Sequence, residues 1–123
     1  MPYPYKDYPN QSCNATNGIN NGTLDVGVVI VVFNSTVDCL ATYEAIHSNI
    51  NSHNISSENV SVGEAGVAQL SLGHVVEIYF VRGNVFADIW VDSGHSGVSI
   101  TNLTEWTLNI ATIQDSKIQN FYS

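Results

Sequence analysis

One short stretch of the chain has the residue types for acyl transfer. Residues 94–98 read Gly-His-Ser-Gly-Val, close to the Gly-x-Ser-x-Gly turn that presents a nucleophilic serine in hydrolases. Ser96 would be the nucleophile, and its base would have to come from one of three distant histidines: His47, His53 or His74. Val98 stands where the sharp turn needs a residue without a side chain. We therefore expect a Gly/Ser loop here and no catalytic residue.

A second set of residues could bind or cleave a carbohydrate. In the predicted strand 85–92, Phe86, Asp88, Trp90 and Asp92 alternate with apolar residues and share one face. Aromatic rings can stack on sugars, and paired carboxylates can hydrolyse glycosidic bonds. Both acids belong to one strand, however, and no separate second carboxylate can be assigned. We expect these four residues to form a binding face for a protein partner or a glycan.

The four histidines, His47, His53, His74 and His95, do not follow a known zinc-ligand spacing. We expect them to be loop or strand-end residues, and their individual roles cannot be assigned from sequence. The sequence also lacks the Gly-x-x-x-x-Gly-Lys pattern of phosphate-binding loops. No metal and no cofactor are predicted.

The charge balance excludes several classes of partner. Charged residues make up 11% of the 123 residues. The chain has eleven Asp and Glu residues and three Lys and Arg residues, which are Lys6, Arg82 and Lys117, so its net charge is −8. Nucleic acids and anionic membranes need clustered Lys and Arg, so neither is an expected partner. The longest apolar run, near Val28–Phe33, is far below the roughly 18 residues of a membrane span.

Seven Asn-x-Ser/Thr triplets begin at Asn10, Asn14, Asn21, Asn34, Asn54, Asn59 and Asn102. The composition alone would give about two such acceptor sites for N-linked glycans. Glycans keep a surface soluble without charged side chains, which would explain the scarcity of Lys and Glu. We expect a glycosylated protein at the cell surface or secreted, whose signal segment is not in this chain.

Cysteine usage agrees with an oxidising location. Cys13 and Cys39 are an even pair without metal spacing, and we expect them to form a disulfide.

Residues 1–22 are predicted to be an extended arm, because prolines alternate with the aromatic residues Tyr3, Tyr5 and Tyr8. The remainder, residues 23–123, is predicted to be one domain, and its 44% hydrophobic content suffices for a core.

Periodicity predicts four strands. They are Leu24–Phe33, expected to be buried on both faces, one within 60–72, one at 74–82 and one at 85–92. Gly83 and Asn84 predict a two-residue hairpin, and Gly63 or Gly66 a turn or bulge. Val85, Ala87, Ile89 and Val91 are expected to face the core.

Two helices are predicted. One follows a cap at Asn34 or Ser35, with an apolar face at or near Val37, Leu40, Ala41, Ile46 and Ile50. The other is capped by Asn102, with Leu103, Trp106, Ile110, Ile113 and Phe121 near one stripe. Residues 51–59 are expected to be a polar loop. The predicted fold class is α+β, in the order β-α-β-β-β-α, with an antiparallel sheet of about four strands and both helices on one face.

Several short motifs resemble a broad group of secreted α+β modules. Gly63-Glu64, Arg82-Gly83-Asn84, the return strand Val85–Val91 and Lys117-Ile118 match its pattern over roughly residues 24–120. The group includes extracellular sensor domains of bacterial Ser/Thr kinases and related lipoprotein and archaeal cell-surface domains. The resemblance implies sensing or binding, and no shared catalytic residues.

Two functions therefore remain open. We expect a non-catalytic extracellular module that binds a protein or a glycan. The alternative is a self-assembling subunit of an extracellular filament or coat, whose N-terminal arm engages a neighbouring copy by strand addition.

Overall fold

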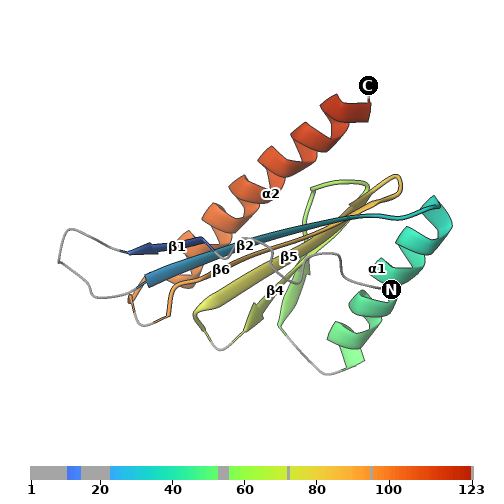
Figure 1. The fold of residues 1–123 in the computed structure, drawn as a ribbon. Coiled ribbons are helices and arrows are strands. Elements are labelled where there is room, and N and C mark those ends of the chain that lie inside the picture. Colours follow the sequence, from blue (N-terminus) through green and yellow to red (C-terminus); the bar gives the residue numbers. More distant parts are fainter. Residues whose placement is uncertain (1–10, 15–22, 53–55, 72, 95, 123) are drawn as a thin grey trace.

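The computed structural model describes residues 11–14, 23–52, 56–71, 73–94 and 96–122. The described part contains β1 (Gln11–Asn14), β2 (Thr23–Val32), α1 (Thr36–Ser52), β3 (Ser57–Asn59), β4 (Ala65–Ser71), β5 (Val75–Arg82), β6 (Val85–Asp92) and α2 (Ile100–Tyr122). The strands form one antiparallel sheet in the order β1-β2-β6-β5-β4-β3 (Figure 1). The predicted α+β class, with one antiparallel sheet and two helices, is confirmed. The two extra strands lie in the predicted arm (β1) and in the predicted loop 51–59 (β3).

The two helices cover opposite faces of the sheet, which corrects the expectation that they share one face (Figure 1). In β6, Val85, Ala87 and Ile89 pack on the side of α2, whereas Phe86 packs on the side of α1. Sequence periodicity separates the two faces of a strand but does not say which helix covers which face.

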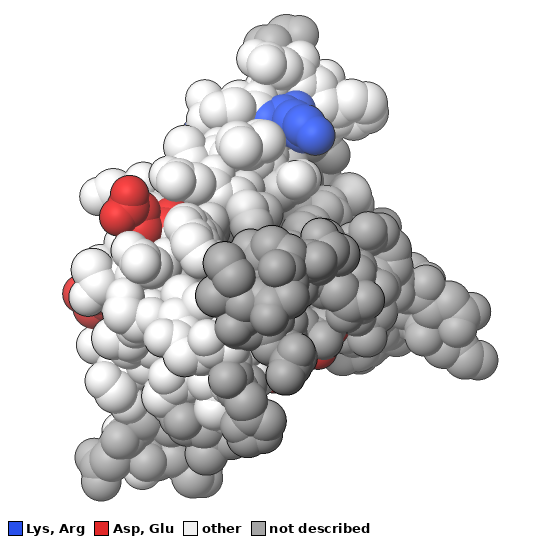
Figure 2. Space-filling view, turned by 90° about the vertical axis from the view of Figure 1, so that its left-hand side faces the viewer, with Lys and Arg blue, Asp and Glu red and all other residues white. Residues whose placement is uncertain are grey.

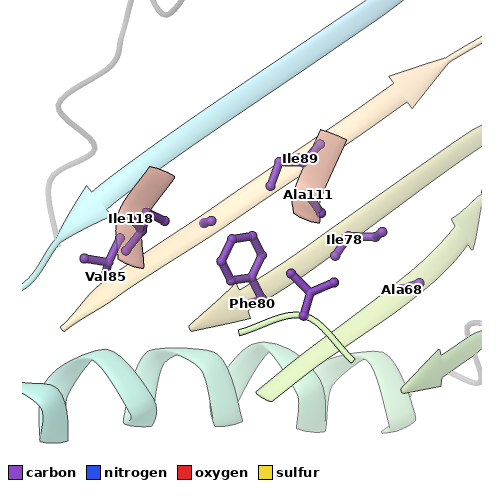
Figure 3. Close-up of a cluster of buried hydrophobic side chains, with 9 residues drawn as sticks. Ala68, Ile78, Phe80, Val85, Ile89, Ala111 and Ile118 are labelled. Atoms are coloured by element: carbon purple, nitrogen blue, oxygen red, sulfur yellow. The ribbon is translucent and has the colours of Figure 1, made fainter. Parts of the chain in front are cut away.

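The larger core lies between the sheet and α2. Figure 3 shows Ala111 and Ile118 of α2 over Phe80, Ile89 and Val85 of the central strands. Burying each large aliphatic or aromatic side chain contributes at most about 1.5–3 kcal/mol to the free energy of folding. These contacts position β5 and β6, which carry the candidate site.

The buried stripe of α2 differs from the predicted one. Leu103 is buried as expected, but the helix continues inward with Thr107, Ala111, Asp115 and Ile118. Three residues of the predicted stripe are exposed instead: Trp106, Ile113 and Phe121. Small residues at 107 and 111 let the helix approach the sheet closely, and hydrophobicity alone does not identify them as buried.

In α1, Cys39, Tyr43 and Ile50 are buried and Ile46 is half-buried. The predicted core residues Val37, Leu40 and Ala41 lie on the exposed side instead. The helix begins as predicted, because the Ser35 hydroxyl accepts a hydrogen bond from the Asp38 amide at 3.1 Å. In α2 the cap lies three residues earlier than predicted, since the Ser99 hydroxyl accepts from the Asn102 amide.

β2 is not buried on both faces as expected. Val29 and Val31 are buried beneath α1, but Ile30 and Val32 are exposed on the opposite face. The reason is that α2 packs mainly on β5 and β6 and leaves the neighbouring β2 partly uncovered.

A two-residue turn joins β5 to β6 as predicted, with Arg82 paired to Val85 and Gly83 at φ +60°. The turn residues Gly83 and Asn84 are held by hydrogen bonds to two other parts of the chain. The Gly83 amide donates to Glu64 at 2.7 Å, and the Asn84 side-chain amide donates to the Phe33 carbonyl at 2.7 Å. These contacts give the Gly-Glu and Arg-Gly-Asn motifs a structural role.

Asp115 links this hairpin to α2. Its carboxylate accepts hydrogen bonds from the Arg82 guanidinium through Nε and Nη2, from the Gly63 amide at 3.0 Å and from Gln119. These partners lower the pKa of Asp115 although its burial acts in the opposite direction. Gly63 has φ +67°, and a Cβ there would meet the Val81 carbonyl oxygen, so the turn favours glycine.

We predict that Asp115→Ala lowers the free energy of unfolding by about 3 kcal/mol, because it leaves the half-buried Arg82 and the Gly63 amide without their acceptor. Urea denaturation at pH 6 measures the loss. The control is Ser116→Ala on the exposed side of the same helix turn, which should change stability by less than about 0.5 kcal/mol. Equal effects of the two substitutions would contradict the proposed role of Asp115.

Candidate functional site

The candidate site lies on the sheet face that α1 covers, beyond the buried contacts of that helix. Asp88, Trp90 and Asp92 of β6 line a hollow of about 350 Å³ together with Val75 and Glu77 of β5. The hairpin register places Glu77 opposite Trp90 and Val75 opposite Asp92, so both strands present these side chains on one face.

Three of the four residues predicted as a binding face therefore lie together. Phe86 does not belong to the site, because it is 2% exposed and packs in the core beneath α1. Its ring lies 6.1 Å from that of Tyr79, measured between centroids. The alternation along β6 is as predicted, but α1 covers the beginning of the strand and not its end.

Asp88 and Glu77 form a carboxyl pair in the hollow. Burial raises the pKa of Asp88 to about 9, and a hydrogen bond to Glu77 and its negative charge act in the same direction. Asp88 is therefore protonated at neutral pH and can donate its proton to the Glu77 carboxylate. Gln69 also donates to Glu77, at 3.4 Å.

This pair differs from a glycosidase pair in how its carboxyl groups interact. Asp88 is hydrogen-bonded to Glu77, whereas the two carboxyl groups of a glycosidase stand on either side of the scissile bond. The Asp88 atom Oδ1 is buried and has no hydrogen-bond partner within the described ranges. The arrangement fits an acceptor for a hydrogen-bond donor better than a pair for glycosidic cleavage.

Trp90 has a fixed place beside the pair. Its indole ring lies over Gly27 of β2, which is the directly opposite residue in the sheet. A Cβ atom at position 27 would overlap the ring, so Gly27 makes room for the indole. The ring is partly exposed and can contribute an apolar surface to the hollow.

Asp92 stands at the end of β6. Its Oδ1 accepts hydrogen bonds from the Gly94 amide at 2.8 Å and contacts His74 Nδ1 at 2.9 Å. His74 and Asp92 are each about one-third exposed, so this pair forms the solvent-facing rim of the site. Glu77 was not among the residues predicted for a site, and His74 was expected only as one possible base for Ser96.

Among the described residues, the candidate catalytic side chains Ser96, His47 and His74 do not come together. The Ser96 hydroxyl is buried and has no hydrogen-bond partner among the residues described, so neither His47 nor His74 activates it. His47 instead stacks on Tyr43, with 6.0 Å between ring centroids. His53 and His95 lie outside the described residues. Within those residues, no group of three His, Cys, Asp or Glu side chains could hold a metal ion.

The predicted disulfide between Cys13 and Cys39 is not formed. Cys39 is a free thiol, fully buried near the beginning of α1, and its pKa is raised to about 11 by burial and by the charge of Glu64. Cys13 is paired opposite Leu24, at the other end of β2 from α1. The strand from Leu24 to Val32 spans roughly 26 Å, whereas a disulfide needs Cα atoms within about 7 Å.

The predicted glycan acceptors whose side chains are described are all exposed. Asn34 follows β2, Asn59 ends β3, and Asn102 lies in the first turn of α2. Asn10, Asn21 and Asn54 lie outside the described residues, as do Tyr3, Tyr5 and Tyr8 of the predicted arm, and only the backbone of Asn14 is described, in β1. No helix in the described part has the length and hydropathy to cross a membrane.

Comparisons with protein-family models, with curated proteins and with solved structures gave no match. The resemblance to secreted sensor-like modules stays a prediction from the sequence.

We predict that stability falls as pH rises because of Asp88. The pKa of Asp88 is about 9 in the folded protein and near 4 in an unfolded chain. The contribution of Asp88 to the free energy of unfolding is therefore complete below pH 4 and is lost as pH rises toward 9. The limiting slope for one proton is about 1.4 kcal/mol per pH unit. Asp88→Asn, which resembles the protonated group, should remove that slope and stabilise the protein at pH 8.

Urea denaturation between pH 4.5 and 8.5 measures how the free energy of unfolding depends on pH in the unmodified protein and in Asp88→Asn. Glu44→Gln, which removes an exposed acid from α1, should leave the slope of the unmodified protein unchanged. A slope that persists in Asp88→Asn would show that Asp88 is not the group responsible.

Proposed function

We propose that the chain is a non-catalytic, N-glycosylated module of the cell exterior that binds a ligand through the hollow formed by Glu77, Asp88, Trp90 and Asp92. One observation carries the proposal: carboxyl groups and an indole ring converge on one sheet face and line a hollow there. The main chain of two paired strands holds these side chains, so the site is preorganised.

The chemistry of the hollow favours a glycan over an apolar ligand. Glu77 and Asp92 supply acceptor oxygens, and hydroxyl groups of a sugar would supply the donors. The Trp90 indole adds an apolar surface for the ring faces of a sugar. A protein segment that offers hydroxyl or amide donors is the second ligand class that this site fits.

The surface supports a location outside the cell. The three described acceptor asparagines are exposed. Figure 2 shows one face of the molecule on which acidic and basic residues form small separate patches among uncharged residues. A surface with so little charge can be kept soluble by glycans.

The alternative, an assembling subunit, is favoured by a different observation. Within the described residues, Gly27–Val32 of β2 have a partner strand on the side of β6 and none on the other side. Such an edge can accept a strand from a neighbouring copy. Against this, β1 belongs to the predicted arm and pairs with β2 of its own chain.

We predict binding to arrayed oligosaccharides that depends on the hollow. Trp90→Ala and Asp92→Asn should each weaken binding at least tenfold, because one removes the apolar platform and the other an acceptor charge. Trp106→Ala is the matched control, since Trp106 is the other tryptophan and lies on the outer side of α2. Array binding followed by calorimetric titration of the glycans that bind measures the effects. An unmodified protein that binds no glycan, or equal losses in Trp90→Ala and Trp106→Ala, would contradict glycan binding at this site.

We also predict glycans on the native protein. Mass spectrometry of peptides, before and after enzymatic removal of glycans, should find Asn34, Asn59 and Asn102 modified, because all three acceptor side chains are exposed. Unmodified asparagines at all three positions in protein isolated from its source would contradict the proposed location.

A further inference from the structure

The acids of the candidate site belong to a larger negatively charged area on the same sheet face. The register between β2 and β6 places Asp25 directly opposite Asp92. Directly opposite residues of antiparallel strands point to the same face, so Asp25 lies beside the solvent-facing end of the hollow. Together with Glu77 and Asp88, four of the chain's eleven acidic residues lie on this part of one sheet face.

This arrangement places like charges next to each other, which costs free energy of folding. Acids that stand directly opposite each other on antiparallel strands destabilise the sheet, and Asp88 stands beside Glu77 only with a shared proton. The residues that line the hollow include no Lys, Arg or His. Arg82 is paired with Asp115, and Lys117 belongs to α2 on the other face of the sheet. A concave site with charge of one sign attracts ligands of the opposite charge.

His74 offsets this charge only in part. Its Nδ1 lies 2.9 Å from Oδ1 of Asp92 at the rim, and it is positively charged only when protonated. Asp25, Asp92 and the Asp88–Glu77 pair each supply one negative charge. Within the described residues, an excess of negative charge therefore remains on this face even when His74 is protonated.

The acids are spread along the strand, which disfavours a single metal ion as the ligand. Asp88 and Asp92 are four residues apart in β6, so their Cα atoms are roughly 13 Å apart. No group of three His, Cys, Asp or Glu side chains in the described ranges could hold a metal ion. Charges at this spacing suit an elongated ligand that carries more than one positive group.

Trp90 lies between the acids and favours a ligand that contains rings. It is two residues from Asp88 and two from Asp92 on the same face of β6, and its indole lies over Gly27. The apolar face of a sugar ring can stack on an indole. An ammonium group close to the same indole gains a cation–π interaction. A sugar with a free amino group makes both kinds of contact.

We propose that the hollow binds oligosaccharides whose amino sugars carry free, unacetylated amino groups. This proposal rests on the proposed glycan-binding function and names the class of glycan. The ammonium groups donate charge-assisted hydrogen bonds to Glu77 and Asp92, while one sugar ring stacks on Trp90. Glycans with carboxylate or sulfate groups are disfavoured, because their charge repels that of Asp25 and Asp92.

The test compares two tetrasaccharides that differ only at their amino groups, β-1,4-linked glucosamine and its fully N-acetylated form. Calorimetric titration at pH 6, where the amino groups are protonated, should give a dissociation constant roughly 20-fold lower for the glucosamine tetramer, because hydrogen bonds to charged groups are the stronger ones. Glu77→Gln and Asp92→Asn should each reduce this ratio roughly fourfold or more.

The matched control is Glu105→Gln. It removes the same charge from an exposed position on α2, on the other face of the sheet, and should change the ratio less than about twofold. Tetralysine serves as a second control, because it carries positive groups on a flexible chain without sugar rings.

Four outcomes would overturn the proposal. Equal affinity for the two tetrasaccharides would show that free amino groups are not recognised, while glycan binding at the hollow would stand. Equal losses in Glu77→Gln, Asp92→Asn and Glu105→Gln would show attraction to the net charge of −8 and not to the hollow. Tetralysine that binds as tightly as the glucosamine tetramer would show that a basic peptide suffices. Binding of neither tetrasaccharide would also exclude this class, and it would contradict the proposed function only if no other oligosaccharide on the array bound.

Discussion

The structure depends on unequal cover of the two faces of one sheet. α2, with 23 residues, runs along β5 and β6 from Leu103 to Ile118 and buries the alternating residues Val85 to Val91. α1, with 17 residues, packs on the other face against Phe86, Val81 and Val67. On the α1 face, strand residues beyond these contacts need not be apolar. The carboxyl groups and Trp90 of the candidate site lie in this uncovered part of the face.

The same constraint explains the chemistry of the hollow. Asp88 adjoins the region that α1 covers, so its carboxyl group is buried, and the neighbouring Glu77 makes a second negative charge costly. A protonated Asp88 avoids both costs, because no charge is then buried and no second negative charge stands beside Glu77. Glu77 remains a charged acceptor. Asp92, at the end of the strand, lies near solvent and is oriented by His74 and Gly94. On the α1 face of β6, Phe86 is buried in the core, Asp88 adjoins it, and Asp92 at the end of the strand is about one-third exposed.

The sequence predicts much of this arrangement. The alternation in 85–92 and the Gly83-Asn84 turn place Asp88, Trp90 and Asp92 on one face, and a two-residue turn also fixes Glu77 opposite Trp90. The turn and the strand alternation therefore contain the information that places Glu77 beside Trp90. The burial of Phe86 could not be predicted, because periodicity does not assign a helix to a face. The inward position of Thr107 and Asp115 was equally hidden, since a small or paired polar residue is buried through its partners and not through hydrophobicity.

The candidate site depends on the carboxyl groups of Asp88 and Glu77, which share one proton on the sheet face that α1 covers in part. Carbon-detected NMR of the side-chain carboxyl groups, recorded from pH 3 to pH 10, observes this proton directly. The account predicts that the Asp88 carboxyl carbon keeps the chemical shift of a protonated acid at neutral pH and titrates near pH 9. Titration of Asp88 near pH 4, like an exposed aspartate, would show that its carboxyl is neither buried nor paired with Glu77, and would contradict the account.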